Sequence, residues 1–181
     1  MNQVMQLWTG IVGAYRGSDE SDALSFNTNS YVHSSDFTVY DMDTPTLSGS
    51  SGIGFAWSTG VATVYSMKDS VANGPFIDFY YDNDGTFTSA DFRTASCWVN
   101  QSGFLLSTST YDNLTTVATT GYSNATTPVA NGQIWQVYLP KNSSSDWHYA
   151  KFRIDAVTMS PYVHAQVTFA FQTIKNFARV D

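Results

Sequence analysis

Several aspartates gather around one predicted turn of the chain, and their carboxylates have the chemistry to bind a calcium ion. They are Asp78, Asp82, Asp84 and Asp91. Calcium in proteins is held by roughly six to eight oxygen atoms at about 2.3–2.6 Å, many of them from carboxylates. Because these side chains are close in sequence, we take them as the candidate calcium ligands.

The same segment matches the calcium-binding loop of an EF-hand only in part. Asp82 and Asp84 fall at the positions of two early ligands, and Asp91 falls at that of the last ligand. Tyr80, however, stands where the first carboxylate belongs. Aspartates are also frequent in turns that bind no metal, because their side chains accept hydrogen bonds from the backbone. The sequence therefore leaves open both a calcium site and an ordinary turn.

Aromatic side chains are the second group with binding chemistry. Trp98, Trp135 and Trp147 would stack on a sugar ring or a porphyrin if they are exposed, because their rings combine a flat apolar face with a polar edge. Alternatively, they fill the core of the fold. Tyr111 and Tyr122 complete the candidate ligand-binding residues. They lie in residues 107–128, a segment rich in Ser, Thr and Asn. The sequence leaves open whether this segment is an edge strand, a long loop or a ligand-contacting arm.

No catalytic arrangement is recognisable among the reactive residues. His33, His148 and His164 are isolated from one another, and no G-x-S-x-G motif supplies a serine nucleophile. Cys97 is the only cysteine, so it cannot form an intrachain disulfide, and we expect it to be a small buried hydrophobic residue. We therefore predict that the protein is not an enzyme, although a pair of glycosidase carboxylates would not be visible in a sequence.

Short β-rich runs separated by turn residues recur along the chain, at the spacing typical of sandwiches and barrels. The expected strands cover residues 4–15, 37–41, 54–57, 62–67, 76–81, 97–107, 134–139, 149–157 and 164–171. Because the chain has 181 residues and no obvious linker, we expect one domain over residues 1–181. The predicted fold is all-β, an antiparallel sandwich or a partly open barrel of roughly nine strands with little helix.

Two hairpins are predicted from the turn residues. The first joins the strand that ends at Tyr81 to residues 86–88 through Asp82-Asn83-Asp84-Gly85, whose Asp-Gly pair is typical of a primed hairpin turn. The second joins residues 134–139 to residues 149–154 through a loop rich in serine. In both cases the two strands are expected to be antiparallel neighbours.

The charge of the chain limits its partners. Charged residues make up 13% of the sequence, against about a quarter in a typical domain, so hydroxyl and amide side chains must cover the surface. The formal net charge is −7 and the basic residues form no patch, which argues against nucleic-acid binding. No apolar run reaches the ~18 residues of a transmembrane helix, and residues 1–17 lack the features of a signal peptide. A mature exported protein and a cytoplasmic one would both look like this.

Several short motifs occur in the order and spacing of one known family. In the last third of the chain they are Trp135-Gln136-Val137-Tyr138, Tyr149-Ala150-Lys151-Phe152-Arg153-Ile154 and Val167-Thr168-Phe169-Ala170-Phe171, and upstream they are Phe55-Ala56-Trp57-Ser58-Thr59-Gly60 and Ile77-Asp78-Phe79. The chain thereby resembles, over about two thirds of its length, the HmuY-like family of secreted bacterial haem-binding lipoproteins. The resemblance implies an all-β fold, export to the cell surface, and capture of a ligand without catalysis.

The chain departs from that family where haem would be bound. Ile77 replaces the family's tryptophan, and the Gly-rich stretch that follows it in the family is missing. The family's axial ligands are His or Met residues just before the strand that residues 135–138 resemble, but no His or Met occurs here between Met67 and His148. Haem iron needs such donors. The family's ligand pair therefore cannot be transferred to this chain, and we expect no haem.

The leading hypothesis is an exported, non-catalytic β-domain that binds an unidentified ligand or partner at the cell surface. A second is a self-assembling filament or surface-layer subunit, with or without calcium, in which the apolar segment from Val4 to Tyr15 adds a strand to a neighbour's sheet. A third is haem capture, with Tyr111, Tyr122 or Cys97 as the iron ligand. A carbohydrate-binding module is the fourth.

Overall fold

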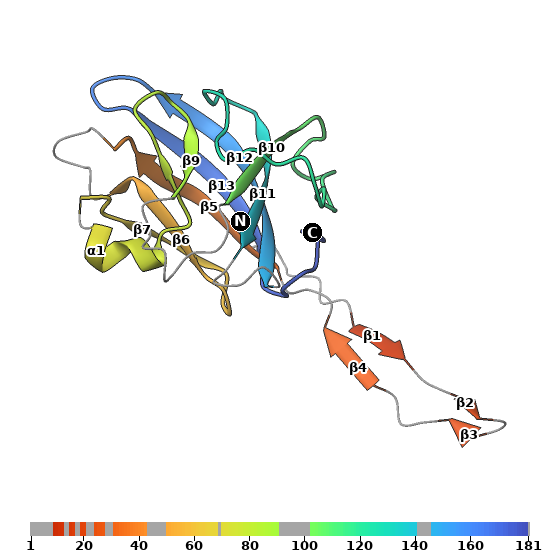
Figure 1. The fold of residues 1–181 in the computed structure, drawn as a ribbon. Coiled ribbons are helices and arrows are strands. Elements are labelled where there is room, and N and C mark those ends of the chain that lie inside the picture. Colours follow the sequence, from red (N-terminus) through yellow and green to blue (C-terminus); the bar gives the residue numbers. More distant parts are fainter. Residues whose placement is uncertain are drawn as a thin grey trace. The chain divides into compact units, whose positions relative to one another are not determined.

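The computed structural model describes residues 9–12, 15–16, 19–20, 24–27, 31–42, 50–68, 70–90, 102–140 and 146–180. The chain divides into two compact units, residues 1–30 and residues 31–181. In the first unit, β1 (Thr9–Val12) pairs antiparallel with β4 (Leu24–Asn27), and β2 (Tyr15–Arg16) pairs with β3 (Asp19–Glu20) (Figure 1). Residues 4–8 and 13–14 of the first predicted strand lie outside the described residues.

The second unit consists of two antiparallel sheets packed on a shared core (Figure 1). The larger sheet has the order β10 (Gly103–Ser107), β11 (Ile134–Pro140), β12 (Trp147–Thr158), β13 (His164–Gln172), β5 (Tyr31–Tyr40). The smaller sheet has the order β7 (Val61–Tyr65), β6 (Gly52–Ala56), β8 (Phe79–Tyr81), β9 (Phe87–Ser89). The predicted all-β fold is thus confirmed, as a sandwich whose sheets do not close into a barrel.

Helical structure among the described residues of this unit lies mainly in the connection between β7 and β8. A single helical turn, α1 (Ser70–Asn73), and a 3-10 turn, η2 (Gly74–Phe76), lead from β7 to β8. Over the ranges that the structure describes, no helix has the length and apolar character that a membrane span requires.

The strands form where apolar residues alternate with polar ones, and each strand predicted in the second unit overlaps an observed one. β5 begins at Tyr31 rather than Phe37, because pairing with β13 extends it through residues that show no apolar alternation.

Both predicted hairpins are confirmed, since β8 pairs with β9 and β11 pairs with β12. In the first hairpin, the Gly85 N–H donates to the Asp82 carbonyl at 3.1 Å, so Asn83 and Asp84 are the central residues of the turn and Gly85 follows them with a φ of 81°. The primed turn predicted from the Asp-Gly pair is therefore wrong, because that turn needs Asp84 and Gly85 at its centre.

The core between the sheets is built largely of phenylalanine rings. Phe152 of β12 is fully buried, and its ring centroid lies 5.1 Å from that of Phe87 and 6.3 Å from that of Phe79, both in the smaller sheet. Phe104 and Phe169 of the larger sheet approach the same ring at 6.4 and 6.0 Å. Burial of large aromatic side chains is a main source of folding stability. These rings therefore fix which face of the larger sheet turns inward.

Residues 107–128, whose structure the sequence leaves open, form a long loop. Ser123 exchanges two backbone hydrogen bonds with Phe104 of β10, at 2.8 and 2.9 Å. One residue further on, the carbonyl of Asn124 accepts a hydrogen bond from the N–H of Ser89 in β9 at 2.8 Å. The loop thus links the edge strands of the two sheets on one side of the sandwich.

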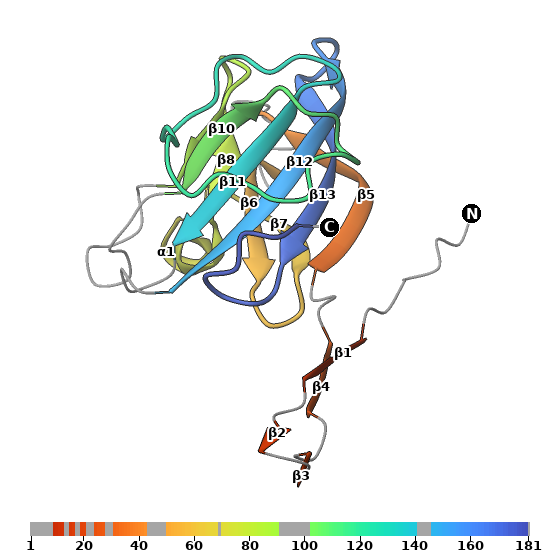
Figure 2. The same cartoon turned by 90° about the vertical axis from the view of Figure 1, so that its right-hand side faces the viewer.

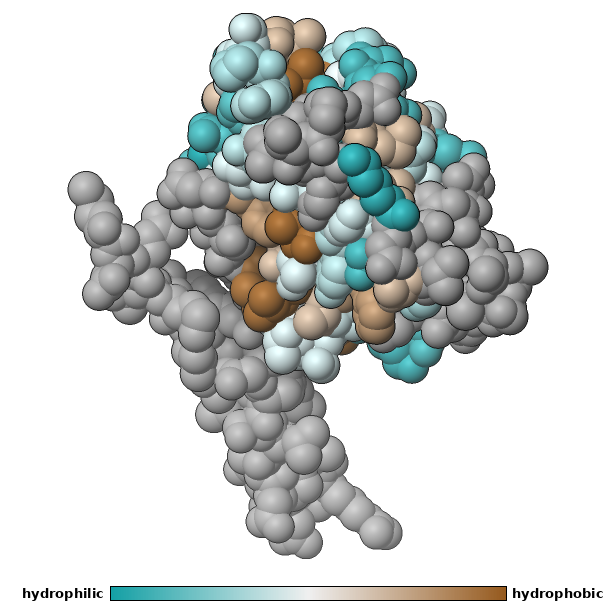
Figure 3. All heavy atoms as spheres, turned by 90° about the vertical axis from the view of Figure 1, so that its left-hand side faces the viewer, coloured by the Kyte–Doolittle hydropathy of each residue, from teal (hydrophilic) through white to brown (hydrophobic). Residues whose placement is uncertain are grey.

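The outer faces of the two sheets are covered differently. The 107–128 loop and the C-terminal segment 173–180 cross the outer face of the larger sheet (Figure 2). On the side where α1, β6 and β7 lie, apolar side chains reach the surface (Figure 3). Val61 of β7 is 54% exposed, and Phe76 of η2 is 59% exposed. Chain segments therefore build a second layer over the outer face of the larger sheet.

Candidate functional site

Three aromatic side chains meet on the outer face of the larger sheet because of the register between β11 and β12. Side chains alternate between the two faces of a strand. Val137 and Leu139 of β11 belong to the core, so Tyr138 between them lies on the outer face, where Tyr149 of β12 is its paired residue. The ring centroid of Tyr138 lies 5.8 Å from that of Tyr149 and 6.2 Å from that of Trp147.

A fourth ring, that of Tyr122, comes from the 107–128 loop. Its hydroxyl donates a hydrogen bond to the Ala118 carbonyl at 2.7 Å, and its ring centroid lies 5.8 Å from that of Tyr138. The loop approaches Gly103 of β10 so closely that a Cβ on this glycine would lie 2.6 Å from Tyr122 Cβ. A residue without a side chain is therefore required at position 103 for Tyr122 to reach the other rings.

The C-terminal segment stands beside Trp147. The N–H of Asn176 donates to the Trp147 carbonyl at 2.8 Å, and Asn176 Oδ1 accepts a hydrogen bond from the Trp147 N–H at 3.1 Å. Further along, the Ala178 carbonyl accepts a hydrogen bond from the N–H of Val117 at 2.9 Å. The segment is thus bonded both to β12 and to the 107–128 loop.

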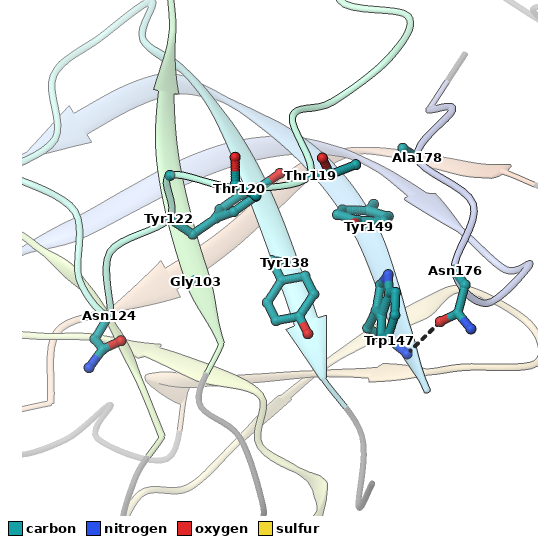
Figure 4. A pocket seen from close by; sticks show the side chains of 11 residues that line it. Gly103, Thr119, Thr120, Tyr122, Asn124, Tyr138, Trp147, Tyr149, Asn176 and Ala178 are labelled. Carbon is teal, nitrogen blue, oxygen red and sulfur yellow. Dashed lines mark hydrogen bonds between the residues drawn. The ribbon is translucent and has the colours of Figure 1, made fainter. Parts of the chain in front are cut away.

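These elements surround a pocket of about 490 Å³, which we call the aromatic pocket (Figure 4). Its lining residues are Gly103, Thr119, Thr120, Gly121, Tyr122, Asn124, Tyr138, Trp147, Tyr149, Asn176 and Ala178, and none of them is charged. Tyr149 is almost fully buried, whereas Asn124 and Asn176 are exposed. The volume lies in the range of about 300–1,000 Å³ that sites for small molecules occupy.

The buried ammonium group of Lys151 anchors the loop to the outer face of the sheet. Lys151 is 4% exposed, and its Nζ donates hydrogen bonds to the carbonyls of Tyr111 and Leu114, both at 2.8 Å. The same atom lies 4.5 Å from the centroid of the Tyr111 ring, within the range of a cation–π interaction. Gln136 of β11 adds a further contact, because its Oε1 accepts a hydrogen bond from the Ala118 N–H at 2.6 Å. These contacts fix the course of the loop before it reaches the aromatic pocket.

The tyrosine hydroxyls of the aromatic pocket are held in the protonated form. Burial raises the pKa of Tyr122 and of Tyr138 above the usual value near 10, and the nearby Tyr149 raises both further. Burial also raises the pKa of Tyr149, and this effect outweighs that of the Trp147 side chain, which lowers the same pKa. Trp147 Nε1 is itself buried and makes no hydrogen bond of good geometry with the described residues. Protonated phenols both donate and accept hydrogen bonds, so the pocket is suited to binding polar groups.

Two of the predicted ligand-binding residues, Tyr122 and Trp147, line the aromatic pocket. Sequence reasoning misses Tyr138 and Tyr149, which complete it. Both belong to a predicted hairpin, and their alternation with its apolar residues is the signal that places them on the face opposite the core.

The other predicted ligand-binding residues lie elsewhere. Trp135 is 4% exposed in the core, where its Nε1 donates a hydrogen bond to Gln133 Oε1 at 3.2 Å. The alternative prediction for Trp135, that it fills the core of the fold, is therefore confirmed. Tyr111, a residue of the 107–128 loop, is 8% exposed and its ring lies against Lys151. Trp98 lies outside the described residues.

Three of the four aspartates predicted to bind calcium lie among the described residues, and they accept hydrogen bonds from the backbone. Asp78 is 3% exposed, and its Oδ2 accepts a hydrogen bond from an N–H of β6 at 2.8 Å. Asp82 and Asp84 accept hydrogen bonds from N–H groups of their own turn at 2.7 and 2.9 Å. Asp91 lies outside the described residues. Among the residues that are described, no three His, Cys, Asp or Glu side chains are placed to hold a metal ion together, and calcium binding stays a prediction.

The aromatic pocket does not fit haem iron. Its lining contains no His, Met or Cys, the residues that most often ligate haem. Ligation by Tyr122 would require a phenolate, which the raised pKa of this side chain opposes. His148 is buried and does not line the pocket, and its Nδ1 lies 2.8 Å from the Gln172 carbonyl. Cys97 lies outside the described residues.

No protein-family model, no curated protein and no solved structure matches the chain. The resemblance to the HmuY-like family therefore stays a prediction.

We expect Lys151→Met to destabilise the protein. The substitution keeps a long apolar side chain but removes the donor of two hydrogen bonds to loop carbonyls. Loss of hydrogen bonds to a charged group costs roughly 1.5–3 kcal/mol in the free energy of unfolding. Urea unfolding followed by tryptophan fluorescence measures this loss.

Lys175→Met is the matched control for that substitution. Lys175 Nζ pairs with Asp146 Oδ1 at 3.0 Å, and both side chains are largely exposed. Surface ion pairs of this kind contribute little, so the free energy of unfolding is expected to change by less than about 0.5 kcal/mol. Equal losses for the two variants would contradict the anchoring role of Lys151.

The stability of the protein is expected to fall as the pH rises above the ordinary pKa of tyrosine. The unfolded chain loses phenol protons near pH 10, whereas burial raises the pKa of Tyr122 in the folded protein. Above about pH 10 the unfolded state therefore binds fewer protons than the folded state, so the free energy of unfolding decreases there and is unaffected well below it.

Tyr122→Phe removes the titrating hydroxyl and is expected to make this decrease shallower. Urea unfolding at several pH values between about 9 and 11 gives the slope for the wild type and the variant. The difference between the two proteins near pH 7 reports only the lost hydrogen bond to Ala118. A variant with the wild-type slope would show that Tyr122 does not govern the alkaline loss of stability.

Proposed function

We propose that the second unit is an exported, non-catalytic domain that binds a small neutral ligand in the aromatic pocket. The observation that carries this proposal is the convergence of four rings, from β11, β12 and the 107–128 loop, around a pocket whose lining bears no charge. Concave sites lined by aromatic groups with a few polar groups at fixed positions are typical of small-molecule binding.

The chemistry of the lining favours binding over catalysis. General acid–base catalysis needs a group whose pKa lies near the working pH. The ionisable groups in this pocket are tyrosines, and burial moves the pKa of Tyr122, Tyr138 and Tyr149 further above neutrality. Their hydroxyls therefore serve as hydrogen-bonding groups.

The location outside the cytoplasm rests on composition and resemblance. Only 13% of the residues are charged, so Ser, Thr and Asn supply much of the polar surface. The motifs that resemble those of the HmuY-like family point the same way, because members of that family are exported to the cell surface.

A ligand of the aromatic pocket is expected to lose affinity when one of the rings is removed. Saturation-transfer NMR with a library of neutral small molecules identifies binders, and calorimetry gives their Kd for the wild type, Tyr138→Ala and Trp147→Ala. Removal of an aromatic anchor from the centre of a site costs about 2 kcal/mol or more, which is roughly thirtyfold in Kd.

Tyr162→Ala is the control for these variants, because it removes an exposed ring that does not line the pocket. Its Kd is expected to equal that of the wild type. Ligands that bind all variants equally would argue against the aromatic pocket as the site. Turnover of any member of a panel of glycan and ester substrates would argue against a non-catalytic function.

Self-assembly through the first unit is a second candidate function. β1 and β4 form a two-stranded hairpin within the compact unit of residues 1–30. Isolated two-stranded hairpins are only marginally stable in water. Such a hairpin gains stability when its edge adds to a sheet of another chain, which is the assembly expected for the segment from Val4 to Tyr15.

If assembly proceeds through this hairpin, multi-angle light scattering of the full chain will show particles larger than a monomer that grow with concentration. Ile11→Pro removes one backbone N–H from β1 and is expected to shift the particles to the monomer. The measurement is repeated with and without calcium. A strictly monomeric wild type in both conditions removes this candidate.

A further inference from the structure

We infer that the ligand of the aromatic pocket is a short neutral saccharide, an inference that rests on the binding function proposed above. A sugar ring presents a face of C–H groups and an edge of hydroxyl groups. A site for it must therefore combine flat apolar rings with groups that both donate and accept hydrogen bonds. The aromatic pocket supplies both kinds of surface.

The rings of the pocket offer open apolar surface. Tyr138 lies between the other rings (Figure 4), and the planes of Tyr122, Trp147 and Tyr149 are tilted from its plane by 37°, 43° and 56°. Tyr122, Tyr138 and Trp147 are each only partly buried. Part of each ring is therefore left for contact with the C–H face of a sugar, as stacking on an aromatic face requires.

The polar groups around these rings are better suited to sugar hydroxyls than to a ligand that only donates or only accepts hydrogen bonds. Thr119, Thr120 and Asn124 line the same pocket, and all three are exposed. Hydroxyl and carboxamide groups each supply a donor and an acceptor, as sugar hydroxyls do. A proline-rich peptide also binds aromatic grooves, but it offers mainly carbonyl acceptors. The composition of the lining therefore favours a saccharide over such a peptide.

The absence of charged residues from the pocket lining favours neutral sugars. None of the lining residues is charged. Asp146 and Lys175, the sequence neighbours of Trp147 and Asn176, pair with each other at 3.0 Å. A charged sugar would lose hydration on entering the pocket without gaining an opposite charge from its lining, which is unfavourable.

The test is a glycan array that carries neutral, acidic and amino glycans, probed with the full chain. Calorimetry with the neutral glycan of strongest response then gives Kd for the wild type and for variants. We expect retention of neutral glycans, and a Kd weaker by roughly tenfold or more for both Tyr138→Ala and Asn124→Ala. Tyr162→Ala, at an exposed tyrosine outside the pocket, keeps the wild-type Kd. Circular dichroism checks the fold, and if Tyr138→Ala unfolds, the exposed Asn124 carries the test.

The outcomes separate this inference from the function on which it rests. Retention of acidic or amino glycans instead of neutral ones overturns the inference of a neutral saccharide. A second result also overturns it: no glycan binds, but a non-sugar molecule or a proline-rich peptide binds the wild type and not Trp147→Ala. In that case the proposed binding function stands. If no molecule binds in a manner that depends on Trp147 or Tyr138, both proposals are overturned.

Discussion

The second unit depends on the antiparallel register between β11 and β12. Because side chains alternate along a strand, a shift of one residue would exchange the inner and outer faces of one strand relative to the other. The register observed places Val137 and Phe152 in the core and Tyr138 and Tyr149 on the opposite face. One hairpin thus supplies both the hydrophobic core that stabilises the sandwich and the rings that form the aromatic pocket.

The outer face of the larger sheet is unusual because polypeptide covers it where water commonly would. Antiparallel sheets often leave one face solvated. Here that face carries Lys151, whose burial is favourable only because its ammonium group finds hydrogen-bond acceptors. Both acceptors are carbonyls of the 107–128 loop. The ammonium group therefore fixes the course of a segment that has few apolar residues of its own across the sheet, and this course brings Tyr122 to the aromatic pocket.

The strands could be predicted because their apolar alternation is a local property of the sequence. The candidate site could be predicted only in part. Trp135 and Trp147 both lie in or beside predicted strands, and only their positions in the alternation of side chains distinguish the core residue from the pocket residue. Trp135 lies on the same face as Val137, and Trp147 lies on the same face as Lys151. The course of residues 107–128 could not be predicted, because it is set by hydrogen bonds to residues distant in sequence. Aspartates near a turn predict backbone hydrogen bonds as readily as a metal site, and those described make such bonds.

The 107–128 loop and the C-terminal segment are bonded to each other across the outer face. Val117 donates a hydrogen bond to Ala178, and Val180 donates one to Thr115, both at 2.9 Å. Because each segment is held in part by the other, they would detach together, as one cooperative unit of local unfolding. Their amide protons would then exchange with deuterium at similar rates. A molecule seated between them would slow the exchange even of amides that it does not touch.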